Sequence, residues 1–156
     1  MINLLRYFLK KNTTINTTIL KIKFLFKYGL EPEIKFLYKN FIFNTSIDVG
    51  SNSGHVTNIL SKICKNVYSF EPIDYLYKAQ KKIFKNKNVR VFNHALGDKN
   101  YKRVFFISKN NDPESSFLVK KKDSKKKIIK IIKGDTAFKY NQIDFIKIDV
   151  EGFELN

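Results

Sequence analysis

The sequence predicts an α/β domain built on a parallel, doubly wound sheet. Two observations lead to this prediction. From Thr45 onward, short apolar strands alternate with amphipathic helices through short connections. The turn GSNSG, Gly50 to Gly54, follows the first of these strands, at the place where open α/β sheets bind their ligands. Alternation of this kind produces parallel strands joined by right-handed crossovers.

Residues 1–43 are predicted to be a helical segment, separate from a domain that spans residues 44–156. Apolar residues recur at helical spacing from Ile15 to Phe26 and again from Ile34 to Phe41. Pro32 falls in the first turn of the second stretch, where its missing N–H is harmless. We expect these helices to cover the sheet and to carry no chemistry.

The sheet elements follow in order along the chain. The strand SIDVG leads into the glycine turn, and Pro72 ends the second strand, NVYSFEP. The third strand is NVRVFN, and the two helices between the strands are marked by apolar positions at helical spacing. These positions are Val56, Ile59, Leu60 and Ile63 in the first helix, and Leu76, Ala79 and Ile83 in the second.

Residues 101–134 interrupt the alternation. The stretches YKRVFFI and KIIKIIK predict two strands of a hairpin-like insertion with a lysine-rich, solvated tip over Lys120–Lys127. Asp135 is predicted to cap a short helix. Ile143–Val150 is predicted to be the fourth parallel strand, and the sheet is expected to be incomplete after it.

The charge of the chain gives little information about its partner. Thirty Lys and Arg residues against fourteen Asp and Glu residues leave a formal charge of +16. Lys, Asn, Ile, Phe and Tyr are abundant throughout, which indicates a chain-wide compositional bias rather than a localised basic patch. Because positive charge alone cannot recognise a nucleotide sequence, we do not expect a nucleic-acid partner.

Cysteine usage and the first residues predict a cytoplasmic protein. Cys64 is the single cysteine, so an intramolecular disulfide and a cysteine-based zinc cluster are excluded, and its apolar helix pattern predicts a buried small side chain. The start, MINLLRYFLKK, lacks the features of a signal peptide, and no run reaches the ~20 apolar residues of a membrane span. The basic, amphipathic start leaves a weak peripheral membrane contact open.

The glycine turn favours a nucleoside ligand without phosphates. Asn52 holds the middle place, so the turn is neither the G-x-G-x-x-G of dinucleotide folds nor the G-K-[ST] of phosphate loops. Gly50 can adopt positive φ, and Gly54 lets the helix begin close to a ligand. Asp48, on the preceding strand, could order the turn or attract a cationic group.

Two further segments lie at the same predicted sheet edge. Glu71 ends the second strand, where a carboxylate can accept both hydroxyls of a ribose; the alternative is that Glu71 caps the following helix. After the third strand, the loop NHALGD could present its backbone at Ala95 and Leu96 to an adenine. A ribose carboxylate, an adenine loop and an acid near the methionine end together describe S-adenosylmethionine.

These motifs, in this order, resemble the FkbM-type methyltransferases. The matching pieces are DVGSNSG, FEP, NHALGD, the serine pair of ESSFLV and KIDVEGFE, within about residues 31–155. The resemblance implies a class I (Rossmann-like) methyltransferase fold, of which residues 44–156 would be the N-terminal half. It also implies S-adenosyl-L-methionine as cofactor and methyl transfer to a hydroxyl oxygen of a sugar, glycolipid or secondary metabolite.

The resemblance also implies roles for individual residues. Asp48, Gly50, Asn52 and Gly54 would surround the methionine end of the cofactor, with Glu71 on the ribose. Asp149 and Glu151, at the tip of the fourth strand, would face methyl donor and acceptor as the catalytic pair. Asp149 is expected to orient the acceptor hydroxyl or act as its base.

Several alternatives stay open. Lys147 is either a structural partner for an acid or a catalytic residue. Asp149, Glu151 and Glu154 could contribute to a metal site, but no metal is assigned. His55 and His94 are expected to be structural. Because family members continue with a helix and three more strands, the chain is either an enzyme completed by further sequence or a partner, or a truncated remnant that at most binds cofactor or another protein.

Overall fold

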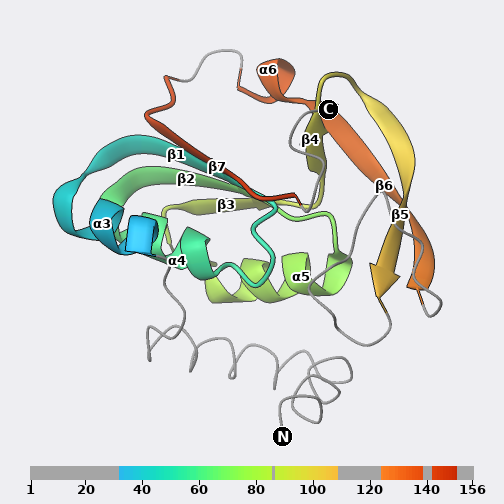
Figure 1. Cartoon of the computed structure of the whole chain (residues 1–156), viewed down its shortest axis with the longest axis horizontal. Coiled ribbons are helices and arrows are strands. Elements are labelled where there is room, and N and C mark those ends of the chain that lie inside the picture. The colour runs from blue at the N-terminus through green and yellow to red at the C-terminus, as the bar shows by residue number, and fades with distance from the viewer. Residues whose placement is uncertain (1–31, 86, 109–123, 139–141, 151–156) are drawn as a thin grey trace, which may run out of the picture.

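The computed structural model describes residues 32–85, 87–108, 124–138 and 142–150, which form two sheets (Figure 1). The larger sheet is parallel throughout, with the strand order β3-β2-β1-β7. Its strands are β1 (Phe43–Val49), β2 (Cys64–Phe70), β3 (Val89–Phe92) and β7 (Phe145–Ile148). The predicted parallel α/β architecture is therefore confirmed.

One face of the parallel sheet is covered by helices. These are α3 (Pro32–Asn40), α4 (His55–Ile63) and α5 (Asp74–Ile83), and Figure 1 shows α4 and α5 on the same side of the strands. Leu60 and Ile63 of α4 form a buried cluster with Val67 of β2, because the apolar residues of this helix recur on one stripe. Pro32 begins α3, as the sequence predicted.

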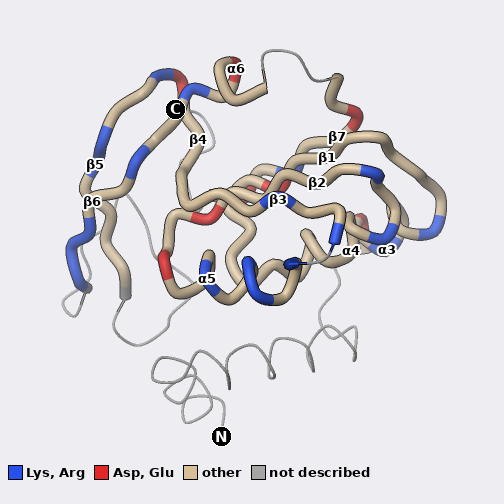
Figure 2. Tube along the Cα trace, turned by 180° about the vertical axis from the view of Figure 1, so that it is seen from behind, with Lys and Arg blue, Asp and Glu red and all other residues tan. Residues whose placement is uncertain are grey.

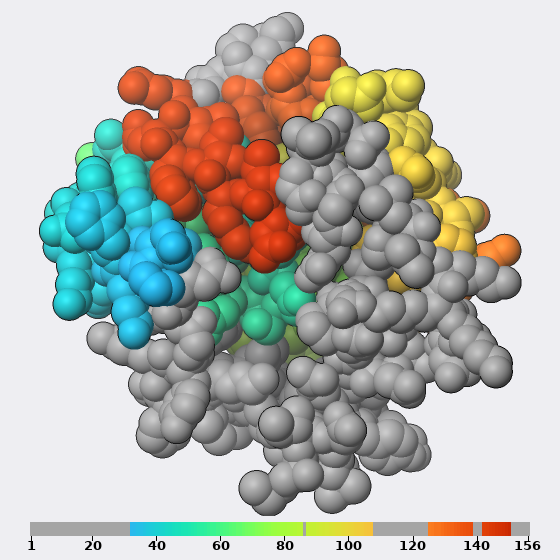
Figure 3. All heavy atoms as spheres, viewed as in Figure 1, coloured from blue at the N-terminus to red at the C-terminus, as the bar shows by residue number. Residues whose placement is uncertain are grey.

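The opposite face of the sheet is aromatic. Phe70 is buried, stacks on Phe92 with ring centroids 4.9 Å apart, and meets the edge of Phe138 at 5.5 Å. Ile146 and Ile148 of β7 point to this face and are 48% and 54% exposed. Among the described strands, β7 lies at the sheet edge beside β1, and Figure 3 shows it in red at the molecular surface.

A second, three-stranded sheet stands at the side of the first, with the order β4-β6-β5. Its strands are β4 (Ala95–Gly97), β5 (Tyr101–Ser108) and β6 (Ser124–Lys133). The antiparallel pairing of β5 and β6 confirms the predicted hairpin. Ala95–Gly97, predicted as a loop, is instead a short strand parallel to β6, because its backbone finds partners from Ile131 to Lys133.

The second sheet is fastened to the start of α5. Its inner side chains Phe105, Ile129 and Ile131 are buried in one cluster with Ile73, which immediately precedes that helix. Lys127 adds an ion pair to Asp74, with 2.7 Å between Nζ and Oδ2. The segment predicted to be an insertion therefore forms a second sheet that packs beside the carboxyl ends of β2 and β3.

Some predicted boundaries were wrong. Asp135 does not cap α6 (Gly134–Ala137), because it lies inside the first turn and pairs with Lys133 at 3.2 Å. Cys64 is buried as predicted but begins β2 instead of continuing the helix, and its Sγ lies 2.8 Å from the Ser46 hydroxyl. The predicted helical segment ends early, because Phe43 already pairs with Cys64 as the first residue of β1.

The predicted N-terminal helix over Ile15–Phe26 and most of the lysine-rich tip lie outside the described residues. Basic side chains in the described parts are spread over β5, β6 and the helices (Figure 2). Within these parts, no helix is long and apolar enough to cross a membrane.

Candidate active site

The turn after β1 requires both of its glycines. Gly50 and Gly54 have φ angles of 72° and 78°, in the left-handed region that side chains with a Cβ rarely adopt. A Cβ at Gly50 would lie 2.0 Å from the carbonyl oxygen of Asp149, so the chain leaving β7 closes directly onto the turn. At Gly54 a Cβ would meet Gln80 and Phe84 at 3.0 Å, so α4 begins tightly against α5.

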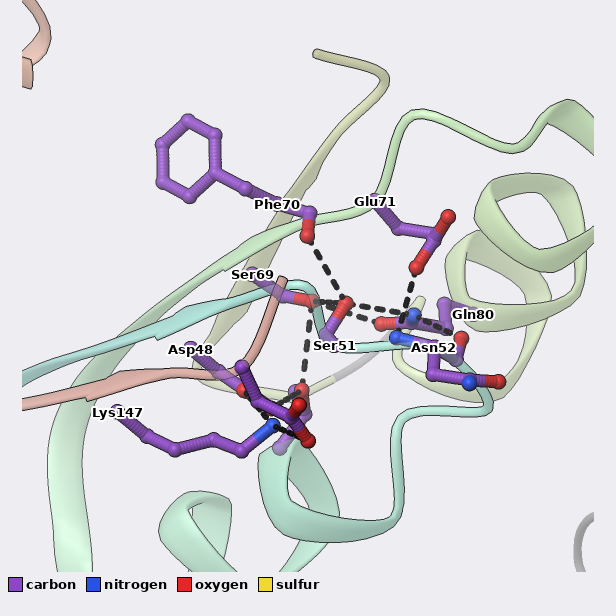
Figure 4. Close-up of polar contacts among 10 residues, drawn as sticks. Asp48, Ser51, Asn52, Ser69, Phe70, Glu71, Gln80 and Lys147 are labelled. Carbon is purple, nitrogen blue, oxygen red and sulfur yellow. Dashed lines mark hydrogen bonds and ion pairs between the residues drawn. The ribbon is translucent and has the colours of Figure 1, made fainter. Parts of the chain in front are cut away.

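Asn52 occupies the middle of the turn with a φ of 50°. Asparagine tolerates the left-handed region better than most residues, which explains its presence between the two glycines. The backbone N–H of Asn52 donates to Oε2 of Glu71 at 2.7 Å (Figure 4). The turn that follows β1 is thereby held against the end of β2.

Glu71 is a buried carboxylate with two backbone donors. It is 3% exposed, and its Oε1 accepts from the N–H of Ile73 at 2.8 Å while Oε2 accepts from Asn52. Burial raises the pKa of Glu71 to about 8, against the two hydrogen bonds, which lower it. Ile73 is the N-cap residue of α5 and no side chain caps this helix, so Glu71 holds the segment that leads into α5 without acting as its cap.

Asp48 is fully buried beneath the same turn. Its Oδ2 accepts a hydrogen bond from the Thr57 hydroxyl at 2.7 Å, and its Oδ1 lies 3.5 Å from Nζ of Lys147. Burial raises the pKa of Asp48, and the lysine charge and the Thr57 hydrogen bond lower it. Asp48 therefore links α4 and β7 beneath the turn instead of facing solvent.

A buried polar network, whose extent was not predicted from the sequence, supports the turn. The Ser69 hydroxyl lies 2.7 Å from Oε1 of Gln80 and 2.8 Å from Oγ of Ser51 (Figure 4). Nε2 of Gln80 donates to Ser51 Oγ and to the carbonyl of Asn52, both at 2.8 Å. The available signal was Gln80 itself, a polar residue four positions after Leu76 on the apolar stripe of its helix.

The segment after β3 lies beside Glu71. The Glu71 N–H donates to the carbonyl of Phe92 at 3.0 Å, and Nδ2 of Asn93 donates to the carbonyl of Glu71 at 3.0 Å. Ala95 is buried against the second sheet, and Leu96 packs against the cluster of Ile47, Val49 and Phe70. Both predicted adenine contacts are thus close to the strand ends, in a strand and not in a loop.

Asp149 follows β7 and is half-exposed. Its N–H donates to the carbonyl of Val49 at 3.1 Å, and its Oδ2 lies 3.2 Å from Nζ of Lys147. Glu151 and Glu154, predicted beside it, lie outside the described residues. In the described ranges, no group of three or more His, Cys, Asp or Glu side chains could hold a metal ion.

The structure thus brings most of the predicted site residues to one sheet edge. The turn from Gly50 to Gly54 touches Glu71 on one side and Asp149 on the other, with Asp48 below. Lys147, which the sequence left undecided, contacts both aspartates. A parallel sheet with a glycine turn after β1 and a buried acid ending β2 is the arrangement of Rossmann-like domains that bind nucleoside cofactors.

Within this class the family is defined by sequence. The family model described as the methyltransferase FkbM domain matches residues 48–156. The chain therefore belongs to the FkbM methyltransferase family, and its fold is that of the class I methyltransferases. No curated protein sequence matches it.

Several solved structures are similar in part. They include a methyltransferase FkbM from Methylobacillus flagellatus KT, with 15% identity, 72% of this chain and 27% of that chain covered, and a TM-score of 0.47. The tRNA (m1A58) methyltransferase TrmI from Aquifex aeolicus is 26% identical; the match covers 39% of this chain and 28% of that chain, with a TM-score of 0.34. The YcgJ protein from Bacillus subtilis is 13% identical; the match covers 40% of this chain and 29% of that chain, with a TM-score of 0.36. The matched part is less than a third of each of those chains.

Proposed function

We propose that this chain binds S-adenosyl-L-methionine at the carboxyl edge of its parallel sheet and serves in methyl transfer to a hydroxyl oxygen. The acceptor class proposed is a sugar, a glycolipid or a secondary metabolite. The observation that carries the proposal is the buried carboxylate of Glu71, which lies 2.7 Å from the N–H of Asn52 in the glycine turn. Membership of the FkbM methyltransferase family supports the same reaction class.

The residues present fit this cofactor. Each carboxylate oxygen of Glu71 accepts one backbone N–H and keeps a lone pair, so two ribose hydroxyls can donate to it. The positive φ angles of Gly50 and Gly54 turn the backbone sharply after β1, which leaves room for a ligand at the carboxyl edge of the sheet. The half-exposed carboxylate of Asp149 is suited to the cationic methionine end, whereas the buried carboxylate of Asp48 is turned to Thr57 and Lys147 instead. When bound, the cofactor supplies an electrophilic methyl group on a sulfonium.

Asp149 is the residue proposed to receive the acceptor. Its carboxylate is half-exposed at the end of β7, and its backbone is held by the hydrogen bond to Val49. A carboxylate there can orient an acceptor hydroxyl in line with the methyl group and accept its proton. Glu151 is proposed to share this task.

A second candidate function is cofactor binding without turnover by this chain alone. The observation that favours it is the exposed aliphatic pair Ile146 and Ile148, on the sheet face where Ile47 and Val49 of the neighbouring strand are buried. A partner that covers this pair would supply the remaining wall of the acceptor site. Transfer of a labelled methyl group by the purified chain to a hydroxyl acceptor would exclude this candidate.

Calorimetry with the purified 156-residue chain tests the proposal. We expect saturable binding of S-adenosylmethionine. At about pH 9, above the Glu71 pKa of about 8, the variant Glu71→Gln should bind at least ~10-fold more weakly, because it loses the charge that strengthens hydrogen bonds to the ribose. Glu33→Gln, an exposed acid in the first turn of α3, is the matched control and should bind normally. Absence of saturable binding by the unmodified chain would refute the proposal.

A further inference from the structure

We propose that Lys147 is a positioning residue of the candidate active site, which joins the buried carboxylate of Asp48 to the half-exposed carboxylate of Asp149 and thereby fixes the orientation of Asp149. The role of Asp149 toward an acceptor rests on the proposed function. The role of Lys147 as the link between the two carboxylates does not.

The strand register places Lys147 under the turn. β7 runs parallel to β1 with Lys147 opposite Asp48, and side chains alternate along a strand. Lys147 therefore points to the helix-covered face, away from the direction of Ile146 and Ile148. Its side chain is 16% exposed, and Figure 4 shows its ammonium group directed at Asp48.

The buried carboxylate of Asp48 is stabilised by the positive charge of Lys147. It is completely buried, and its Oδ2 is satisfied by the Thr57 hydroxyl. Among the described residues, its Oδ1 has no hydrogen-bond donor, so the ammonium of Lys147 at 3.5 Å is the group that faces it. The other charged groups around Asp48 are Glu71 at the end of β2 and Asp149 after β7, both acids, so Lys147 is the one cation that the described part of the site contains.

Asp149 depends on the same cation for the direction of its side chain. Its backbone is fixed by the hydrogen bond to Val49 and by the contact of its carbonyl with Gly50. Its side chain is 56% exposed, and Nζ of Lys147 lies 3.2 Å from Oδ2. One carboxylate oxygen is thereby held toward the protein, which leaves the other for an acceptor hydroxyl.

This arrangement explains why a lysine stands in an otherwise apolar strand. An exposed carboxylate alone would sample several rotamers, and a buried carboxylate alone would take up a proton. A single ammonium between the two restricts the side chain of Asp149 and opposes the rise in the pKa of Asp48 that burial causes. Lys147 thus connects the acid below the glycine turn to the acid that ends β7, across two neighbouring strands.

The test uses the full chain and three variants, with NMR as the readout. Lys147→Met removes the ammonium, Lys147→Arg keeps a cation, and Lys65→Met, an exposed lysine of β2, is the matched control. We expect the side chain of Asp149 to occupy one rotamer in the unmodified chain, Lys147→Arg and Lys65→Met, and to average over rotamers in Lys147→Met. The Asp48 carboxyl should titrate at a higher pH in Lys147→Met, because only the hydrogen bonds to Thr57 then oppose the effect of burial.

A single Asp149 rotamer and an unchanged Asp48 titration in Lys147→Met would overturn the inference. Should Lys147→Met fail to fold, the double variant Asp48→Asn/Lys147→Met removes the buried charge as well, and averaging of Asp149 is still expected there. A single rotamer in the double variant would equally overturn it. Because neither measurement needs a ligand, failure of the proposed function would appear separately, as absence of S-adenosylmethionine binding by the unmodified chain.

Discussion

The two halves of the candidate site bury a carboxylate in different ways. At the ends of β1 and β7, Asp48 is buried beside the ammonium of Lys147 and a hydroxyl donor. At the ends of β2 and β3, Glu71 is buried with only backbone N–H groups as hydrogen-bond donors, and the pKa of Glu71 is raised to about 8. The first half is organised by fixed charge and the second by backbone dipoles. The pKa of about 8 sets the second half to change protonation just above neutral pH.

The largest expected effect is a pH dependence that comes from Glu71. Its pKa is about 8 in the folded chain and about 4.3 in an unfolded one, so the folded chain binds the proton more tightly between these values. Its contribution to the free energy of unfolding is therefore complete below pH ~4 and is lost as pH rises to about 8, a loss on the order of 5 kcal/mol. Urea unfolding of the unmodified chain and Glu71→Gln at several pH values measures the difference.

Glu71→Gln should remove that slope, because an amide does not titrate. Identical pH profiles for the two proteins would contradict the assignment of a raised pKa to Glu71. Glu33→Gln is the control for a general charge effect and should keep the slope.

The next effect concerns the other half of the site. Lys147→Met should lower the free energy of unfolding by about 3 kcal/mol at pH 8, because a buried Asp48 without its cation is costly. The loss should be smaller at pH 5, since Asp48 can then take up a proton in the folded chain and become neutral. An equal loss at both pH values would show that packing, and not charge, is the main contribution of Lys147.

A third prediction concerns the turn that both halves share. Gly50→Ala should destabilise the chain by about 2 kcal/mol or more, because alanine is strained at positive φ and its Cβ would collide with the Asp149 carbonyl. Gly134→Ala is the matched control, since a Cβ there meets nothing within 4 Å. Thermal unfolding of the two variants should separate them clearly, and equal midpoints would contradict the described turn.

The smallest expected effect comes from an ion pair outside the site. Nζ of Lys127 and Oδ2 of Asp74 lie 2.7 Å apart, but the two side chains are 30% and 51% exposed. Water screens such a pair, so Lys127→Met should change the free energy of unfolding by less than about 1 kcal/mol. A loss as large as that of Lys147→Met would mean that burial does not distinguish the two lysines.

The local part of this structure could be predicted from sequence. The glycine turn, Glu71 at a strand end and the parallel sheet follow from spacing and apolar patterns, which depend on near neighbours along the chain. The strand Ala95–Gly97 could not be predicted, because its three residues become a strand only by pairing with Ile131–Lys133 of β6. Likewise, Asp135 is a residue type that favours the N-cap position, but α6 begins before it, at Gly134.

The polar part of the site was predictable only in its outline. Asp48 was identified from its position on the strand before the glycine turn and Asp149 from the resemblance to the FkbM family, whereas the position of Lys147 between them depends on the register of β7 against β1. The network of Ser51, Ser69 and Gln80 depends on the close approach of the glycine turn, β2 and α5, which the sequence pattern does not specify. Contacts between distant segments carry most of what the sequence could not predict.

The docking of β7 also has a consequence for how the chain folds. Asp144, just before β7, accepts hydrogen bonds from the N–H groups of Asn44 and Thr45, which are 100 and 99 residues away in sequence. Such long-range pairing is entropically expensive to close and slow to form. During synthesis, the edge of β1 that pairs with β7 therefore stays unpaired until nearly all of the intervening chain has been made. A chaperone or neighbouring chain has the longest opportunity to bind at this edge.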